Sequence, residues 1–239
     1  MIEYIDGYDI PQAHINALIS LGFGGSNGRF VKITRPFEET SELIYLMQSD
    51  LEVPIDIVQE IESQKNTEKR KVSFQYRSDE LVETPCIIKV AGLNIYNDLI
   101  RNTIPDAIEN FNQIELGIRF EYTSYYARRP HRIRAIRSSH DIVIGTEFGA
   151  GGGRAGFPTN GNPYKYVRIQ RRTSDFGRDV VEHVITHELG HCIGLRHTDF
   201  FDRSISCGIG GNEGNSDVGA IHIPGTPEEV NVDLNSVML

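Results

Sequence analysis

The spacing of apolar residues divides the chain into a first part with helical texture and a second part in which strands and helices alternate. In residues 1–83, apolar positions recur at helical spacing over 11–21 and again over 38–71. Between these stretches, residues 30–33 have the β-branched and aromatic content of a short strand. The pattern therefore predicts a mainly helical N-terminal region.

From about residue 82 the pattern changes to short apolar runs separated by amphipathic stretches. Four runs predict strands, at 86–90, 118–123, 141–144 and 164–170. Two stretches, 103–114 and 179–193, predict helices. The basic run 128–137 is interpreted as a solvated loop between two strands, and the glycine run 149–153 as a flexible connection. This part of the chain predicts an α+β fold.

Charge and hydropathy exclude two kinds of partner. The chain has 24 Lys and Arg against 33 Asp and Glu, which gives a net charge of −9. Binding to nucleic acid by phosphate neutralisation needs a basic surface, so no nucleic-acid partner is expected. No apolar run approaches the ~18 residues that a membrane span needs. The first residues are acidic and do not resemble a signal peptide, so the protein either stays inside the cell or has a leader that is absent from this chain.

The three cysteines leave two interpretations of their redox state. Cys192 and Cys207 are spaced suitably for one disulfide, which we predict for an oxidising compartment, with Cys86 left over. Three buried thiols are the alternative.

The helix predicted at 179–193 contains an H-E-x-x-H string that begins at His187 and ends at His191. Two histidines four positions apart project from the same face of a helix, so both imidazoles can bind one ion. Gly194 can end the helix in a left-handed turn, after which His197 can supply a third nitrogen. Three neutral nitrogens leave one open position on a tetrahedral zinc, which is typical of catalytic sites.

Glu188 stands next to the first histidine and lies off the direction of the ligands. We predict that it takes the proton of a water held by the zinc and later passes it to the leaving amine. A surface helix that carries histidines by chance is the alternative, but the complete H-E-x-x-H-x-x-G-x-x-H string is too specific for it. The predicted site is therefore one Zn²⁺ per chain bound by His187, His191 and His197, with Glu188 as general base.

Residues 187–199 resemble the extended zinc signature of the metzincin metallopeptidases, and residues 235–238 resemble their Met-turn. With Asp199 at the end of the signature and Ile-Pro-Gly-Thr-Pro at 223–227, the chain is most similar to the bacterial dual-action HEIGH metallopeptidases, distant relatives of the astacins. The resemblance covers about residues 84–239. It implies a metzincin-like zincin domain, with a twisted, mostly parallel sheet, one antiparallel edge strand and an active-site helix. It also points to the same disulfide.

A calcium-assisted protease of the pappalysin type is a second possibility. Pappalysins share the His-Thr pair but usually continue with Phe, where this chain has Asp199. Calcium candidates are Asp202, Glu213 and Asp217, but their spacing matches no standard calcium loop, so calcium binding stays open.

Several residues near the signature are expected to have supporting or ordinary roles. Met238 is expected to pack beneath the zinc and not to bind it. His183 is interpreted as a helix-surface residue or as a support for the ligands, and four histidines lack ligand spacing altogether, namely His14, His131, His140 and His222. Asp199 is either a support for the ligand loop or a solvent-facing acid, and both interpretations stay open.

We therefore predict a zinc metalloendopeptidase domain in 84–239 that acts on peptide or protein substrates, preceded by a pro-region or accessory domain in 1–83. Substrate is expected to lie antiparallel to an edge strand at about 153–157. The first 83 residues are expected to keep the enzyme latent, by steric cover or by a carboxylate in the water position, for which Asp6 and Asp9 are the candidates. Cys86, at the start of the peptidase domain, is a thiolate candidate for the same position, with packing as a small apolar side chain as its alternative. The competing class is a zinc-stabilised module that binds peptides without cleaving them. The expected localisation is secreted, periplasmic or at the cell surface.

Overall fold

The computed structural model describes residues 2–4, 11, 13–14, 28–34, 41–47, 51–55, 75–114, 116–207, 220–224, 226 and 236–239. The chain forms two compact units. One is Glu80–Gly194, and the other combines Met1–Asp79 with Leu195–Leu239. The proposed roles of 1–83 as pro-region and 84–239 as peptidase domain stay predictions.

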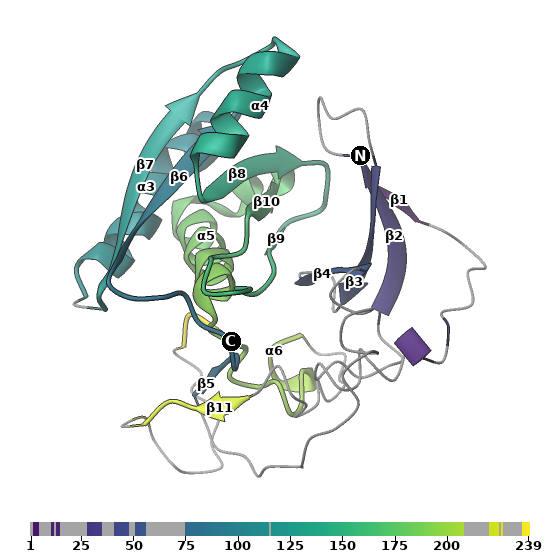
Figure 1. The fold of residues 1–239 in the computed structure, drawn as a ribbon, viewed down its shortest axis with the longest axis vertical. Coiled ribbons are helices and arrows are strands. Elements are labelled where there is room, and N and C mark those ends of the chain that lie inside the picture. Colours follow the sequence, from purple (N-terminus) through teal and green to yellow (C-terminus); the bar gives the residue numbers. More distant parts are fainter. Residues whose placement is uncertain are drawn as a thin grey trace. The chain divides into compact units, whose positions relative to one another are not determined.

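The unit Glu80–Gly194 is built around a five-stranded sheet with the strand order β7-β6-β8-β10-β9 (Figure 1). Its strands are β6 (Cys86–Leu93), β7 (Ile118–Tyr125), β8 (Ile142–Glu147), β9 (Gly153–Arg154) and β10 (Tyr166–Gln170). Neighbouring strands are parallel except β9, which pairs antiparallel with β10. The predicted mixed sheet with one antiparallel edge strand is confirmed.

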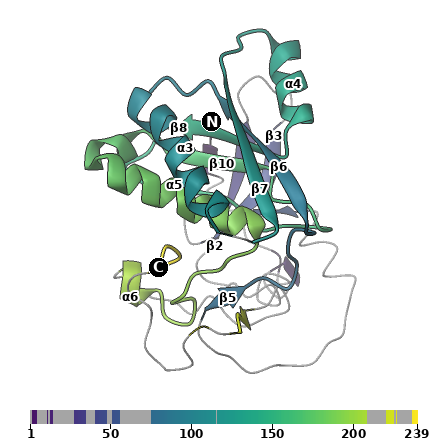
Figure 2. The same cartoon turned by 90° about the vertical axis from the view of Figure 1, so that its left-hand side faces the viewer.

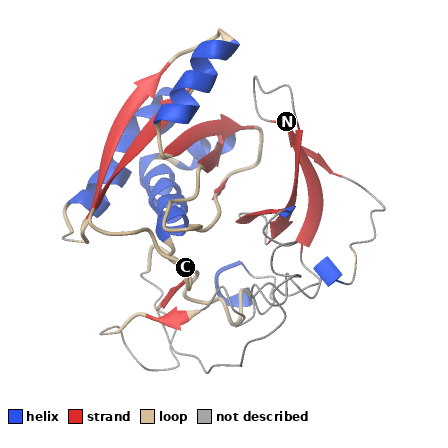
Figure 3. Cartoon of the chain, viewed as in Figure 1, coloured by secondary structure: helices blue, strands red, loops and turns tan. Residues whose placement is uncertain are grey.

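Helices cover both faces of this sheet. α3 (Asp98–Asn112) and α5 (Arg178–Ile193) lie side by side on one face, and α4 (Pro130–Ser139) lies on the other (Figures 1 and 2). In Figure 3 these helices, in blue, pack against the red strands of the sheet. One cluster of buried residues joins Ile133 of α4 to Ala91, Leu93 and Val143 of the sheet. The predicted α+β class is therefore confirmed.

Two predictions in this unit need correction. α3 begins at Asp98 and not at Thr103, because the side chain of Asn97 caps it by accepting a hydrogen bond from the N–H of Ile100 (3.0 Å). Most of the basic run 128–137, predicted to be a loop, lies in α4 instead. Pro130 occupies the first turn of this helix, where its missing N–H costs nothing. The helix buries one face, but the many arginines of the run make that face hard to recognise in the sequence.

The other unit contains a four-stranded antiparallel sheet with the order β1-β2-β3-β4. Its strands are β1 (Ile2–Tyr4), β2 (Gly28–Thr34), β3 (Ser41–Met47) and β4 (Leu51–Pro54). The strand predicted at 30–33 lies within β2, but the helix predicted from residue 38 is wrong where the structure describes it. Ile44, Tyr45 and Leu46 are buried consecutively, and so short an apolar run does not distinguish a helix from a strand.

The prediction of a mainly helical N-terminal region is thus wrong for the described residues. The helix predicted at 11–21 and the amphipathic stretch around 57–61 lie almost entirely outside the described residues.

The same unit also contains a two-stranded antiparallel sheet and a short helix. β5 (Tyr76–Arg77) pairs antiparallel with β11 (Ile221–His222), and α6 is formed by Ser204–Cys207. Among the described residues, no helix combines the length and apolar character needed to cross a membrane.

Candidate metal centre

α5 presents two of the three candidate ligands. Asp179 lies in its first turn, where an acidic side chain interacts favourably with the helix dipole. The helix ends at Ile193 because Gly194 caps it in a left-handed conformation (φ 110°, ψ 8°). Every residue from Ile185 to Ile193 is buried, so this half of the helix is packed on all sides. The motif therefore lies on a rigid element.

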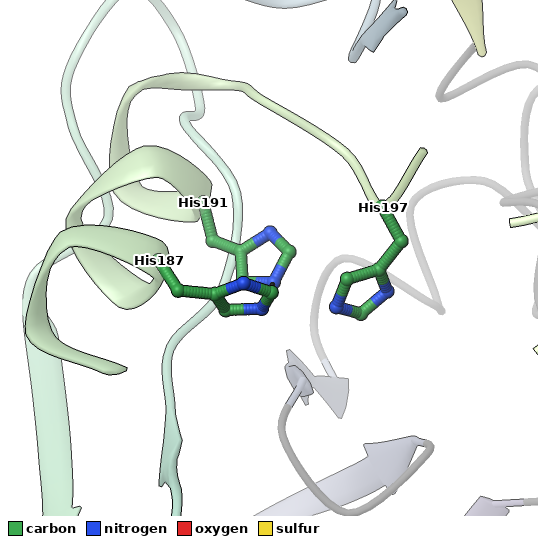
Figure 4. Close-up of side chains that lie close together, drawn as sticks. All are labelled: His187, His191 and His197. Carbon is green, nitrogen blue, oxygen red and sulfur yellow. Dashed lines mark hydrogen bonds between the residues drawn. The ribbon is translucent and has the colours of Figure 1, made fainter. Parts of the chain in front are cut away.

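His187, His191 and His197 lie together, with one ligand nitrogen of each within 4.8 Å of the others (Figure 4). Their exposed fractions are 8%, 0% and 0%. The Nε2 atoms of His187 and His191 are 3.0 Å apart, and their rings meet at 90°. In Figure 4 the His197 ring faces the other two from the segment that follows α5. The structure thus brings together the three histidines that the motif singles out.

This donor set fits a transition-metal ion. Two nitrogens bound to a tetrahedral zinc at ~2.0–2.1 Å lie roughly 3.3–3.4 Å from each other, which is close to the 3.0 Å between Nε2 of His187 and Nε2 of His191. Imidazole nitrogens suit zinc, copper, iron or nickel, whereas calcium and magnesium prefer oxygen ligands. The group can therefore hold one ion of the first kind.

Glu188 and the edge strand β9 border the histidines. Glu188 is 2% exposed, and the backbone of Gly153 packs directly against its side chain. Phe157, which follows β9, packs its ring edge to face against His191, with 5.5 Å between ring centroids. The family resemblance predicts an edge strand through Gly153 and Phe157, but no sequence pattern indicates that either residue contacts the candidate centre.

The segment that carries His197 is fixed by backbone hydrogen bonds on both sides. The N–H of Arg196 donates to the carbonyl of Tyr76 (2.9 Å), and the N–H of Thr198 donates to the carbonyl of Met238 (2.8 Å). The Met238 side chain is 3% exposed. The C-terminal turn therefore supports the chain next to the third histidine, in keeping with the packing role expected for Met238.

Asp199 is buried, and this decides between the two interpretations that the sequence leaves open. Its side chain is 0% exposed and pairs with Arg203. It also accepts hydrogen bonds from the N–H (3.1 Å) and the hydroxyl (2.6 Å) of Ser206. Asp199 is therefore not a solvent-facing acid, because it ties together the turn that follows His197.

The other described histidines lie outside the group formed by the three candidate ligands. His183 is exposed, with its ring centroid 6.2 Å from that of His187. The remaining ones contact other side chains or solvent: His14 contacts Tyr45, His140 contacts Tyr125, His222 contacts Thr226, and His131 is exposed on α4.

Of the calcium candidates only Asp202 is described. It accepts hydrogen bonds from the N–H (3.0 Å) and the hydroxyl (2.6 Å) of Ser204, and these bonds lower the pKa of its carboxyl. Glu213 and Asp217 lie outside the described residues, as do the latency candidates Asp6 and Asp9.

The predicted disulfide between Cys192 and Cys207 is not formed. Cys192 carries a thiol that is 0% exposed within the fully packed half of α5. It behaves there as a small apolar side chain, so the alternative of a buried thiol applies to it. Cys86 is also a thiol, half-buried at the start of β6, and burial and the nearby Asp141 raise its pKa.

The glycine run at 149–153, predicted to be flexible, is held by side chains. The N–H of Gly151 donates to Oε1 of Gln170 (2.9 Å), and the N–H of Gly152 donates to the hydroxyl of Thr173 (3.0 Å). Because Gln170 and Thr173 lie 19 and 21 positions further along the chain than the glycines that they bind, no local pattern could have identified them.

Comparisons with known proteins place the chain in a family. A family profile described as dual-action HEIGH metallo-peptidase matches residues 44–239. No curated protein matches the chain. Among solved structures, one of myroilysin is 13% identical with a TM-score of 0.37, over 52% of this chain and 54% of that chain. A second myroilysin structure is 16% identical with a TM-score of 0.35, over 50% and 47%. The alignments thus span about half the length of those chains. Because the family profile covers most of the chain, including all three histidines and the C-terminal turn, the chain belongs to the dual-action HEIGH metallo-peptidases.

Proposed function

We propose that the protein is a zinc-dependent endopeptidase that hydrolyses peptide bonds within protein chains. The observation that carries the proposal is a buried group of three histidines with a buried glutamate beside it, in a member of a metallopeptidase family. A site that serves folding alone has no need of a carboxylate next to its ligands, so Glu188 favours catalysis over a peptide-binding module.

His187, His191 and His197 would hold the zinc ion. When bound, zinc polarises the scissile carbonyl and lowers the pKa of a coordinated water towards ~7. Three protein ligands leave a coordination position for water or substrate. The burial of the three imidazoles excludes bulk water from the ligand side of the site.

Glu188 serves as the general base. Its carboxylate takes a proton from the attacking water and later transfers it to the nitrogen of the leaving amine. Such a base contributes about 10²–10⁴-fold to the rate when it stays within hydrogen-bond reach of the proton. The buried position of Glu188 on a rigid half of α5 suits that requirement.

Substrate would lie extended along β9. Gly152 accepts a hydrogen bond from the N–H of Gln170 (2.9 Å), and Gly153 is paired with Ile169. Because hydrogen bonding alternates along an antiparallel ladder, the N–H and C=O of Gly153 are directed away from β10. An extended peptide that pairs with this edge passes next to Glu188. Main-chain pairing suits a protease that accepts varied side chains.

Metal analysis and mapping of cleavage sites test this function together. Purified protein is expected to contain one zinc per chain, and His191→Ala should lose stoichiometric zinc. Wild-type protein should cut a denatured protein mixture at internal sites identified by mass spectrometry. A full zinc equivalent in the variant would contradict the ligand set. Products released only from chain ends would contradict endopeptidase activity.

Latency through the N-terminal region and export from the cell also remain proposals. A truncation that tests latency should keep Tyr76, because its carbonyl accepts the hydrogen bond of Arg196 next to the third histidine. Removal of residues 1–74 is expected to raise peptidase activity. Equal activity in the full and shortened proteins would contradict an inhibitory role.

A further inference from the structure

β9 and α5 approach each other most closely where Gly153 meets Glu188. A Cβ atom added at Gly153 would lie 2.7 Å from Cγ and from Oε1 of Glu188, and 3.0 Å from Cδ. Real Cβ atoms do not approach other atoms so closely, so the glutamate side chain lies in van der Waals contact with the strand backbone. Gly153 is not among the glycines with positive φ. Its backbone conformation therefore accepts other residues, and the space taken by Glu188 is what excludes them.

Thr173 fixes the strand at this point. It lies in the 3₁₀ helix η1 (Arg171–Phe176), directly before α5, and its side chain is 0% exposed. Its hydroxyl accepts a hydrogen bond from the N–H of Gly152 (3.0 Å) and donates one to the carbonyl of the same residue (2.9 Å). One hydroxyl thus holds both backbone polar groups of Gly152, the residue that precedes Gly153.

We propose that Thr173 and Gly153 are positioning residues for the Glu188 carboxylate, an inference that rests on the proposed function of Glu188 as general base. Thr173 fixes Gly152, the strand carries Gly153 over the glutamate, and the close contact removes the rotamers that would swing the carboxylate towards β9. Displacement of a catalytic group by about 1 Å can cost about 100-fold in rate. The support supplied by Thr173 therefore acts on turnover and not on metal binding.

The contact itself is tested without catalysis, by thermal unfolding of metal-free protein. Gly153→Ala should lower the unfolding temperature by roughly 2–12 °C, because it overpacks a filled site. In a Glu188→Ala background the same substitution should have little effect, since the atoms that it meets are gone. An equal shift in the two backgrounds would overturn the contact as the cause.

The positioning role is tested with two matched variants of Thr173. Thr173→Val keeps the shape but removes both hydrogen bonds, and Thr173→Ser keeps the hydroxyl. With one zinc in each protein, Thr173→Val should lower kcat by about tenfold or more, and Thr173→Ser should retain most of kcat. Wild-type kcat in Thr173→Val, or an equal loss in both variants, would overturn the role. Undiminished turnover of Glu188→Gln would overturn the proposed base, and the positioning role with it, whereas the unfolding experiment would still report the contact.

Discussion

Replacing Asp199 with alanine should lower the free energy of unfolding by about 3–5 kcal/mol. The carboxylate is 0% exposed and pairs with Arg203, whose side chain is 9% exposed. Removing one partner of a buried ion pair leaves the other charge in a poorly solvated place, and this term dominates the loss. The N–H and hydroxyl of Ser206 lose their acceptor as well. The turn that follows His197 should therefore loosen.

Urea and thermal unfolding measure this loss, which corresponds to a decrease in unfolding temperature of roughly 6–20 °C for a chain of this size. Asp199→Asn is the matched control, because it keeps the volume and one acceptor oxygen and should lose less. In a double-mutant cycle, the protein with both Asp199→Ala and Arg203→Met should lose less stability than the sum of the two single losses, because neither charge remains. A loss below about 1 kcal/mol, or strict additivity in the cycle, would refute the buried ion pair as the support of this turn.

Substitutions at three further positions test other parts of the centre. Gly194→Ala places a side chain at φ 110° and should lower the free energy of unfolding by about 1–2 kcal/mol. It should also weaken zinc binding, because it displaces His197. An unchanged zinc affinity by calorimetry would contradict this. Because the Met238 side chain is 3% exposed, Met238→Ala should lower the free energy of unfolding by about 2–5 kcal/mol. Met238→Leu should lower it by less than ~1.5 kcal/mol. Equal losses in thermal unfolding would refute the packing role. Burial raises the pKa of Tyr76, so the unfolded chain loses this proton first and stability should fall as the pH rises above about 10. Tyr76→Phe should reduce that loss in urea unfolding between about pH 8 and 11, and an unchanged dependence on pH would show that another group causes it.

The motif helix and the five-stranded sheet were predictable because their signals are local. Histidines four positions apart, Gly194 after the last apolar residue and short β-branched runs each report a conformation within one element. The antiparallel edge strand β9 followed from the family resemblance and not from its sequence, since Gly153 and Arg154 carry no strand pattern.

The N-terminal sheet could not be derived in this way. The apolar residues of β3 fit helical spacing as well as a strand, and pairing with β2 and β4 decides the outcome. α4 is not evident from the sequence because the basic run 128–137 has four exposed arginines and one fully buried apolar residue, Ile133, although Pro130 is a signal of a helix start.

The supporting contacts of the candidate centre depend on partners that only the fold brings together. Asp199 could be assigned to the interior only once Arg203 and Ser206 were seen to pair with it. Thr173 acts on a glycine from another element. The spacing of Cys192 and Cys207 and the family resemblance both predict a disulfide, whereas the packing around α5 buries the Cys192 side chain as a thiol.

The turnover of zinc-loaded Glu188→Gln protein tests the central claim most directly. The substitution keeps the size of a side chain that is 2% exposed, so fold and zinc content should be preserved. An amide cannot accept the proton of the attacking water, and we predict turnover lower than wild type by about 100-fold or more. Wild-type turnover at one zinc per chain would contradict Glu188 as the general base.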